Sequence, residues 1–198
     1  MKMKILALSD TPDKMLWDYL DRRLLEGVEL VLSCGDLPAE YLSFLTCFTD
    51  APILYVCGNH DTGYEKKPPE GCICIDDTLY IHNGVRILGL GGSMRYKAGS
   101  CMYTEREMRH RVHRLAPKLM WHRGFDILVA HAPVRGIGDQ EDLPHQGFEV
   151  FRDLADKYAP RYIIHGHVHQ EYSPEFHRER EYGDTKIINA YKRFFIDL

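Results

Sequence analysis

Side chains that can bind metal ions or move protons follow several short apolar runs in this sequence. After each run, an Asp, Asn or His stands directly next to the last apolar residue or within a few positions of it. These positions are Asp10, Asp36, Asn59, His60, Asp61, His131, His165, His167 and His169. Carboxylate, amide and imidazole groups can together hold divalent cations and carry out acid–base steps. The spacing therefore indicates a metal centre assembled from distant parts of the chain.

Each of these residues taken singly has an ordinary interpretation. Asp and Asn commonly begin turns after strands, and a single histidine such as His131 is more often part of a satisfied core. Taken together at one edge, they would leave buried charge uncompensated unless a cation lay among them. The set contains no thiolate, which favours Mn²⁺, Fe, Co²⁺, Ni²⁺ or Zn²⁺. It offers more ligands than one ion needs, so we expect two ions.

The elements that must position these residues alternate along the chain. The apolar runs are continuous, which is typical of strands covered on both faces. We predict strands at Lys4–Leu8, Glu29–Ser33, Pro52–Cys57, Arg86–Leu90, Asp126–Ala130 and Arg161–Ile164. Helical spacing predicts helices at Asp13–Leu25, Ala39–Phe48, Thr104–Leu115 and Phe148–Tyr158, the third opening on a capping box of Thr104 and Glu107.

This alternation indicates an α/β protein, in which ligands gather at the carboxyl ends of the strands. Two stretches depart from it. Residues 72–97 contain strand-like pieces around the turn His82-Asn83-Gly84, and Thr185–Leu198 reads as two short strands around Ala190 and Tyr191. We predict both stretches to be antiparallel additions. No linker or repeat divides the chain, so we expect a single domain over residues 1–198.

The order of these motifs resembles that of the calcineurin-like metallophosphoesterases over about residues 3–172. Asp10 is followed by Gly35-Asp36, Gly58-Asn59-His60-Asp61, His131 and Gly166-His167-Val168-His169. The resemblance implies a four-layer α/β/β/α sandwich of two mixed sheets flanked by helices. The antiparallel stretches would then fit the second sheet.

The resemblance also implies a dinuclear metal centre, with Mn²⁺ as the first choice of ion. The implied ligands are Asp10 and His169 for the first ion, Asn59, His131 and His167 for the second, and Asp36 between the two. A hydroxide held between the ions would attack phosphorus in line with the ester oxygen. His60 would lie over the substrate phosphate as a proton donor or charge stabiliser, and Asp61 would orient His60 by accepting its other ring hydrogen.

One position departs from the family pattern. The first family motif is Asp-x-His, whereas this chain has Asp10-Thr11-Pro12. Proline has no group that can bind a metal ion, so the first site lacks one imidazole and is expected to be the weaker of the two. His145 and Glu40 are candidates to replace the missing ligand.

Other residues are candidates for substrate binding. Arg95 lies in a glycine-containing segment after a strand, where it either contacts phosphate or is an ordinary surface arginine. The loop from His131 to Gly147 is long, and we expect it to line the rim of the site, with His145 as a substrate contact. His165 has no counterpart among the family ligands, and we interpret it as structural.

Composition limits the functions that fit. The chain has 198 residues, 44% apolar and 27% charged, with a net charge of −4 and six cysteines. No run approaches the ~18 apolar residues of a membrane span. The N-terminal apolar run is too short for a signal peptide. We therefore expect reduced thiols and a cytoplasmic location. The oligomeric state is not indicated.

We therefore predict a metal-dependent phosphoesterase that hydrolyses a small phosphomonoester or phosphodiester. A nuclease is the alternative within enzymes, and it is disfavoured by the negative charge, since the basic stretch at residues 106–123 reads as a solvated helix face. A non-catalytic scaffold that has kept the fold is the alternative outside enzymes. The loss of the motif histidine at Pro12 favours it slightly, whereas the retention of the other motif residues argues strongly against it; these are His60, Asn59, His131, His167 and His169.

Overall fold

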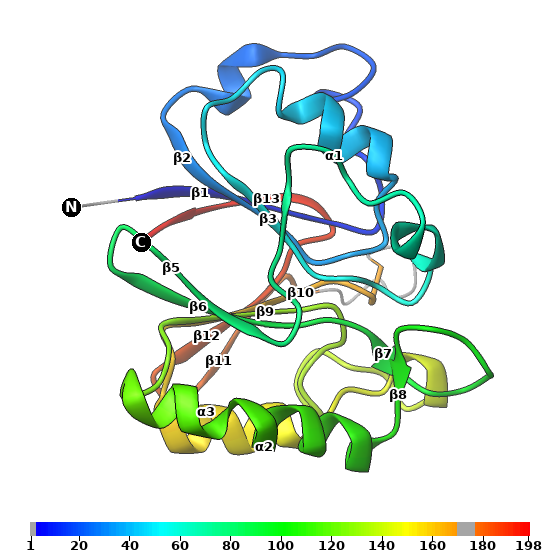
Figure 1. Ribbon diagram of the computed structural model, residues 1–198, viewed down its shortest axis with the longest axis vertical. Coiled ribbons are helices and arrows are strands. Elements are labelled where there is room, and N and C mark those ends of the chain that lie inside the picture. Colours follow the sequence, from blue (N-terminus) through cyan, green and yellow to red (C-terminus); the bar gives the residue numbers. More distant parts are fainter. Residues whose placement is uncertain (1–2, 170–176) are drawn as a thin grey trace.

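The computed structural model describes residues 3–169 and 177–198, and two β-sheets face each other at its centre (Figure 1). The upper sheet contains β1 (Lys4–Ser9), β2 (Val28–Ser33), β3 (Ile53–Tyr55), β4 (Ile73–Cys74) and β13 (Lys192–Asp197). Across the described residues its strand order is β13-β1-β2-β3-β4. The strands β1 to β4 are parallel to their neighbours, whereas β13 runs antiparallel to β1.

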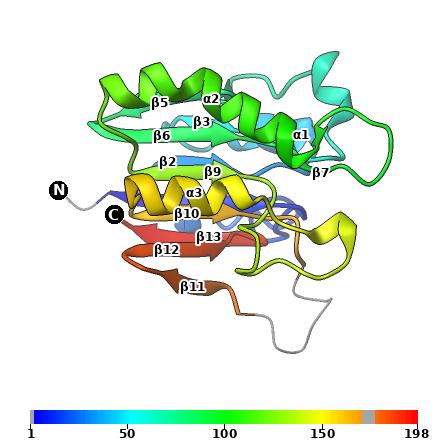
Figure 2. The same cartoon turned by 90° about the horizontal axis from the view of Figure 1, so that it is seen from below.

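The lower sheet contains β5 (Thr78–His82), β6 (Val85–Leu90), β9 (Ile127–Ala130), β10 (Tyr162–His165), β11 (Glu179–Tyr182) and β12 (Thr185–Asn189). Its order in the described part of the chain is β11-β12-β10-β9-β6-β5, which Figure 2 shows from below. The four inner strands are parallel, and the two edge strands are antiparallel to their neighbours. A separate short pair joins β7 (Ser93–Met94) to β8 (Met102–Tyr103).

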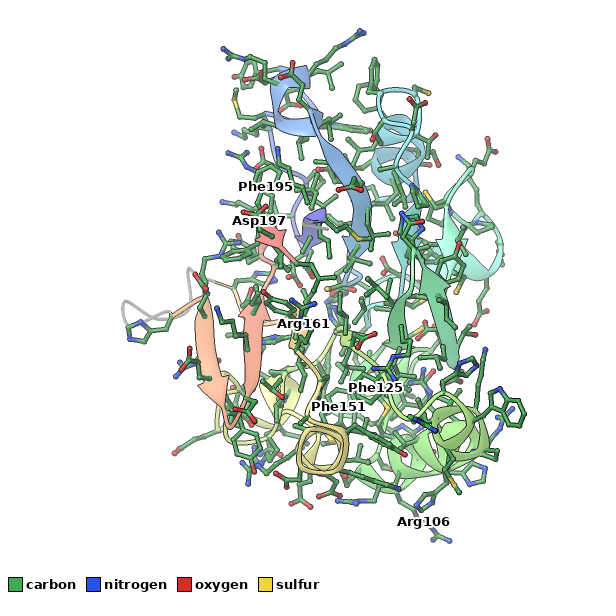
Figure 3. The ribbon with its side chains drawn as sticks, turned by 90° about the vertical axis from the view of Figure 1, so that its left-hand side faces the viewer. Arg106, Phe125, Phe151, Arg161, Phe195 and Asp197 are labelled. Carbon is green, nitrogen blue, oxygen red and sulfur yellow. The ribbon has the colours of Figure 1, made fainter. Side chains whose placement is uncertain are left out.

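Helices cover the outer face of each sheet. The helix α1 (Ala39–Leu45) lies above the upper sheet, and α2 (Glu105–Trp121) and α3 (Glu149–Tyr158) lie below the lower sheet (Figure 1). Three apolar cores follow from this layering: one lies between the two sheets, and one lies between each sheet and the helices that cover it. Phe151 of α3 and Phe125 are both buried and belong to the core between the lower sheet and its helices (Figure 3). The four-layer sandwich that the resemblance implied is therefore confirmed.

The predicted strands are all present, with ends shifted by one or two residues. The hairpin of β5 and β6 turns at Asn83 and Gly84, whose φ angles of 47° and 83° are those of a tight hairpin turn. The capping box is also present: Thr104 Oγ1 accepts from Glu107 N, and the Glu107 carboxylate accepts from Thr104 N. The helix α2 continues beyond the predicted Leu115, through Pro117, because Leu119 extends its buried stripe.

The predicted helix at Asp13–Leu25 is wrong. The segment consists of turns and a short 3₁₀ helix at Arg22–Leu25. Leu16 is fully buried, but Tyr19 is exposed and the chain reverses at Leu20 with a φ of 39°. The apolar spacing in this segment therefore does not correspond to one buried helical face.

The C-terminal strands also differ from the prediction. Only β13 is an antiparallel addition, and it belongs to the upper sheet. The strand β12 is parallel to β10 in the lower sheet, with β11 antiparallel beside it. The chain therefore crosses from one sheet to the other at Ala190 and Tyr191. No helix in the described residues is long and apolar enough to cross a membrane.

Candidate metal centre

The residues singled out in the sequence meet where strands of the two sheets end. Asp10 follows β1 and Asp36 follows β2, while His131 follows β9 and His167 follows β10. Asp10, Asp36 and His167 have φ angles of 65°, 57° and 68°, in the left-handed region that non-glycine residues rarely adopt. Such backbone strain is commonly found at functional sites. Here the left-handed conformation lets the backbone turn sharply after each strand, while the side chain of the residue stays at the shared edge of the sheets.

The glycines of the motifs allow these turns to pack closely. A Cβ at Gly58 would collide with the Asp36 side chain, and a Cβ at Gly166 would collide with the side chain of Ser9. Any larger residue would push the loops apart. The Gly-Asn and Gly-His steps therefore bring Asn59 and His167 within reach of Asp36.

Asp36, Asn59 and His131 form the buried centre of the site. His131 Nε2 lies 3.0 Å from Asn59 Oδ1 and 3.3 Å from Asp36 Oδ2. His131 Nδ1 donates to the Cys34 carbonyl at 2.8 Å, which leaves Nε2 as the atom facing the cluster. This arrangement, in which a backbone carbonyl holds the outer ring nitrogen, is typical of a metal-ligating histidine.

His167 completes a group that could hold a cation. Ligand atoms of Asp36, His131 and His167 all lie within 4.8 Å of one another. His167 Nε2 donates to the Pro144 carbonyl at 2.6 Å, so its Nδ1 is free of a proton and able to bind a metal. Oxygen and imidazole donors at this spacing fit a divalent transition-metal ion.

The electrostatics of the group show the same need for positive charge. Burial alone would lower the pKa of His131, but the neighbouring Asp36 and Asp10 carboxylates raise it to about 10. Burial would also raise the pKa of Asp36, yet the His131 imidazolium holds that pKa well below its usual range. Burial and the charge on His131 lower the pKa of His167 to about 3. One proton on His131 thus offsets the carboxylate.

The residues expected at the first ion lie beside this group. The Asp10 carboxylate accepts the backbone N–H of His167, at 2.9 and 3.1 Å from its two oxygens. His169 Nε2 lies 3.4 Å from Asp10 Oδ1, and its ring stacks on Tyr191 at 4.9 Å between centroids. The two expected first-site ligands are therefore adjacent, although neither belongs to the tight group of Asp36, His131 and His167.

His60 and Asp61 occupy different environments. The His60 side chain is exposed, and its backbone N–H donates to Asp36 Oδ1 at 2.7 Å. The Asp61 carboxylate is buried and accepts the backbone N–H groups of Asp36 and Gly58 at 2.7 and 2.8 Å. Among the described residues no hydrogen bond joins Asp61 to the His60 ring, and Asp61 Oδ2 instead fixes the backbones of the two ligand loops.

Two cavities open on either side of Asp10, Asp36 and His60. One, of about 410 Å³, also contains Asn59, Tyr96, Pro144, His145, His167 and His169. The other, of about 480 Å³, contains Pro12, Leu37, Pro38, Glu40, Tyr64 and Lys67. Tyr96 and Pro144 were not identified from the sequence, although each stands next to a residue that was.

The predicted substrate contacts and replacement ligands are placed as follows. The Arg95 guanidinium bonds to the Met102 carbonyl and the Glu107 carboxylate, away from both cavities. His145 lies in the first cavity, 5.2 Å from the His167 ring, and its Nδ1 is 2.6 Å from Asp142 Oδ2. Glu40 lies in the second cavity, paired with Lys67 at 2.9 Å. Of the two candidates to replace the missing ligand, only Glu40 shares a cavity with Pro12.

The comparisons with known proteins agree with this geometry. The model of the calcineurin-like phosphoesterase family matches residues 3–171, and the chain belongs to that family. UPF0046 protein C25E10.12 of Caenorhabditis elegans is 23% identical over 224 residues, covering 96% of this chain and 75% of its own length.

Solved structures share the fold. TT1561 of Thermus thermophilus superposes with a TM-score of 0.65 at 15% identity, covering 96% of this chain and 90% of its own. GAP50, described as the anchor in the inner membrane complex of Plasmodium, gives 0.58 at 12% identity, covering 95% and 71%.

Proposed function

We propose that this chain hydrolyses a small phosphomonoester or phosphodiester with the help of two divalent transition-metal ions, Mn²⁺ being the first choice. The observation that carries the proposal is the buried group of Asp36, Asn59, His131 and His167, whose donor atoms face one another. A carboxylate, an amide oxygen and two imidazoles at this spacing suit such an ion. When bound, the ions would supply the Lewis acidity that activates water and offsets charge on phosphoryl oxygens.

The residues of this chain have distinct parts in the proposed reaction. Asn59, His131 and His167 would hold the second ion, Asp10 and His169 would hold the first, and Asp36 would serve as a ligand to both. His60 stands exposed where both cavities meet, so a substrate phosphate between the cavities is within its reach. An imidazole in this place can give a proton to the departing ester oxygen.

Hydrolysis of a nitrophenyl phosphomonoester and a bis-nitrophenyl phosphodiester tests the proposal. We expect turnover with Mn²⁺ and its loss on addition of a chelator, with recovery when Mn²⁺ is returned in excess. The matched control is His131→Ala, which should remain inactive at every Mn²⁺ concentration. Absence of turnover with Mn²⁺, Fe²⁺, Co²⁺, Ni²⁺ and Zn²⁺ for both esters would contradict it.

A non-catalytic scaffold is the second candidate, and Pro12 is the observation that favours it. GAP50, which has a similar fold, is described as an anchor. Bound metal without turnover would support this candidate. A nuclease is less favoured, because the chain carries a net charge of −4. The six cysteines are free, which fits a reducing compartment, and we propose a cytoplasmic location on that ground.

A further inference from the structure

The two cavities that meet at His60 differ in the number of expected metal ligands that border them. The first, of about 410 Å³, is bordered by five of these ligands: Asp10, Asp36, Asn59, His167 and His169. Metal ions and a phosphate group held by them would occupy that space. The second, of about 480 Å³, is bordered by Asp10 and Asp36 alone among the expected ligands. It is therefore left for the part of a substrate that is attached to the phosphate.

The wall of the second cavity offers a ligand mainly apolar surface. Its apolar, aromatic and glycine residues are Pro12, Leu37, Pro38, Ala39, Gly63 and Tyr64. The prolines have no backbone N–H to donate. The Tyr64 hydroxyl already donates to the Leu37 carbonyl, which leaves the ring of Tyr64 as the part that can contact a ligand. A cavity with such a wall is typical of a site for an apolar ligand.

The charged residues of the same wall do not favour a charged ligand group. Lys67 is paired with Glu40 at 2.9 Å, and Asp61 accepts two backbone N–H groups of the ligand loops. A negative group in the cavity would face the carboxylates of Glu40 and Asp61, and like charges repel. A positive group would have to displace Lys67 from Glu40. An uncharged group meets neither obstacle.

Pro12 connects this wall with the departure from the family pattern. The pattern has a histidine at this position, whereas the side chain of proline consists of carbon and hydrogen only. The residue that removes a ligand from the expected first metal site therefore also adds apolar surface to the second cavity. An apolar cavity of about 150 Å³ is enough to hold benzene, so the second cavity has room for a group of that size.

We propose that the second cavity binds an uncharged apolar group of the substrate, of the size of a phenyl ring, whose phosphate lies at the metal centre. The inference rests on the proposed function, because it names the class of phosphoester that the same site takes. The apolar group would lie against Pro12, Pro38 and the ring of Tyr64. His60 borders both cavities, so it stands where the ester oxygen between the group and the phosphate would be.

Two phosphonates test this proposal without hydrolysis. Phenylphosphonate and methylphosphonate carry the same kind of anionic group, and their P–C bond is not an ester bond. Calorimetric titration of the Mn²⁺-loaded full chain with each compound gives the two dissociation constants. We expect phenylphosphonate to bind at least about tenfold more tightly, because its ring leaves water for the apolar wall. Equal binding of the two compounds, or no measurable binding of phenylphosphonate, would overturn the proposal.

Gly63→Trp tests whether the ring lies in the second cavity. Gly63 is exposed in the short 3₁₀ helix at Thr62–Glu65, and a Cβ added to it would meet no atom within 4 Å. The larger side chain should therefore leave the fold intact and take up part of the cavity. We expect phenylphosphonate to bind roughly tenfold more weakly than to the parent chain, with methylphosphonate unchanged. The matched control is Thr62→Trp, at an exposed position outside both cavities, which should bind both compounds as the parent does.

The outcomes separate this proposal from the proposed function. Equal effects of Gly63→Trp and Thr62→Trp, or an unchanged preference for phenylphosphonate in Gly63→Trp, would overturn the placement of the apolar group. A preference that is lost in Gly63→Trp, in a chain that hydrolyses no ester, would support the placement and contradict the proposed function. Turnover of esters by a chain that binds both phosphonates equally would support the proposed function and contradict the placement.

Discussion

His60 is held near the metal centre by its backbone, while its ring stays exposed between the two cavities. Replacing it should therefore remove chemistry without removing ligands. We predict that His60→Ala keeps its fold and metal content but loses about 10²–10⁴-fold in kcat, the range for a positioned acid–base group. Metal analysis and turnover of the same preparation measure both quantities.

The control for this variant is His82→Ala, a histidine at the end of β5, outside both cavities. It should retain parental turnover. If His60→Ala lost its metal ions together with its activity, His60 would have to be counted among the ligands.

Pro12 stands where the family pattern has an imidazole, and its surroundings in the second cavity are mainly apolar or already paired. The first ion would have Asp10, His169 and the shared Asp36, one ligand fewer than the second. We predict that a Mn²⁺ titration monitored by calorimetry shows two unequal binding steps. Activity should rise as the weaker site is filled. Pro12→His should tighten that step. Two equally tight sites in the parent chain would show that another group has replaced the histidine.

The ligand candidates could be chosen from the sequence because their residue types and their places after apolar runs are both visible there. The partner of Asp61 could not, because it consists of the backbone N–H groups of Asp36 and Gly58, which leave no mark in a pattern of side chains. The partner of Arg95 could not be predicted either. Its partner Glu107 comes close only after the loop before α2 has folded back.

Among the elements, α2 is tied to the ligand loops through Arg111. This arginine is 8% exposed, and it bonds to Asp76, Asp77 and the Gly91 carbonyl. Asp76 in turn accepts the backbone N–H of Cys57, directly before the Gly-Asn-His-Asp segment. We predict that Arg111→Ala lowers the free energy of unfolding by about 2 kcal/mol, because it removes the cation from the half-buried Asp76 carboxylate and the donor from the buried Gly91 carbonyl. Urea unfolding measures this value.

Arg109, two positions earlier in α2, provides the comparison. It pairs with Glu105 and Asp153, but its side chain is 37% exposed. Exposed pairs of this kind contribute less than about 1 kcal/mol, so Arg109→Ala should change stability far less than Arg111→Ala. Similar losses in the two variants would contradict the assignment of α2 anchoring to Arg111.

Strands were easier to predict than the connections between them. A continuous apolar run such as residues 126–130 can be buried on both faces only as an inner strand, and it is one. Residues 13–25 have helical spacing, but Asp13 caps the N–H of Met15 and pairs with Arg193 of β13. These contacts with a distant strand favour turns, and spacing alone does not reveal them.

At the scale of the whole molecule, the site exists only because two sheets meet. Asp10 and Asp36 come from the upper sheet, and His131 and His167 come from the lower one. The chain joins the sheets a last time between β12 and β13, so that β13 borders β1. The apolar layer between the sheets holds the two sets of ligands at a fixed separation.

The most direct test of this account is a crystal structure of the chain with Mn²⁺, with the ions located by their anomalous scattering. We predict an ion bound by Asp36, Asn59, His131 and His167 at roughly 2.0–2.4 Å, and a second, less occupied ion bound by Asp10, Asp36 and His169. An Mn²⁺-soaked crystal with no ion among Asp36, Asn59, His131 and His167 would contradict the account.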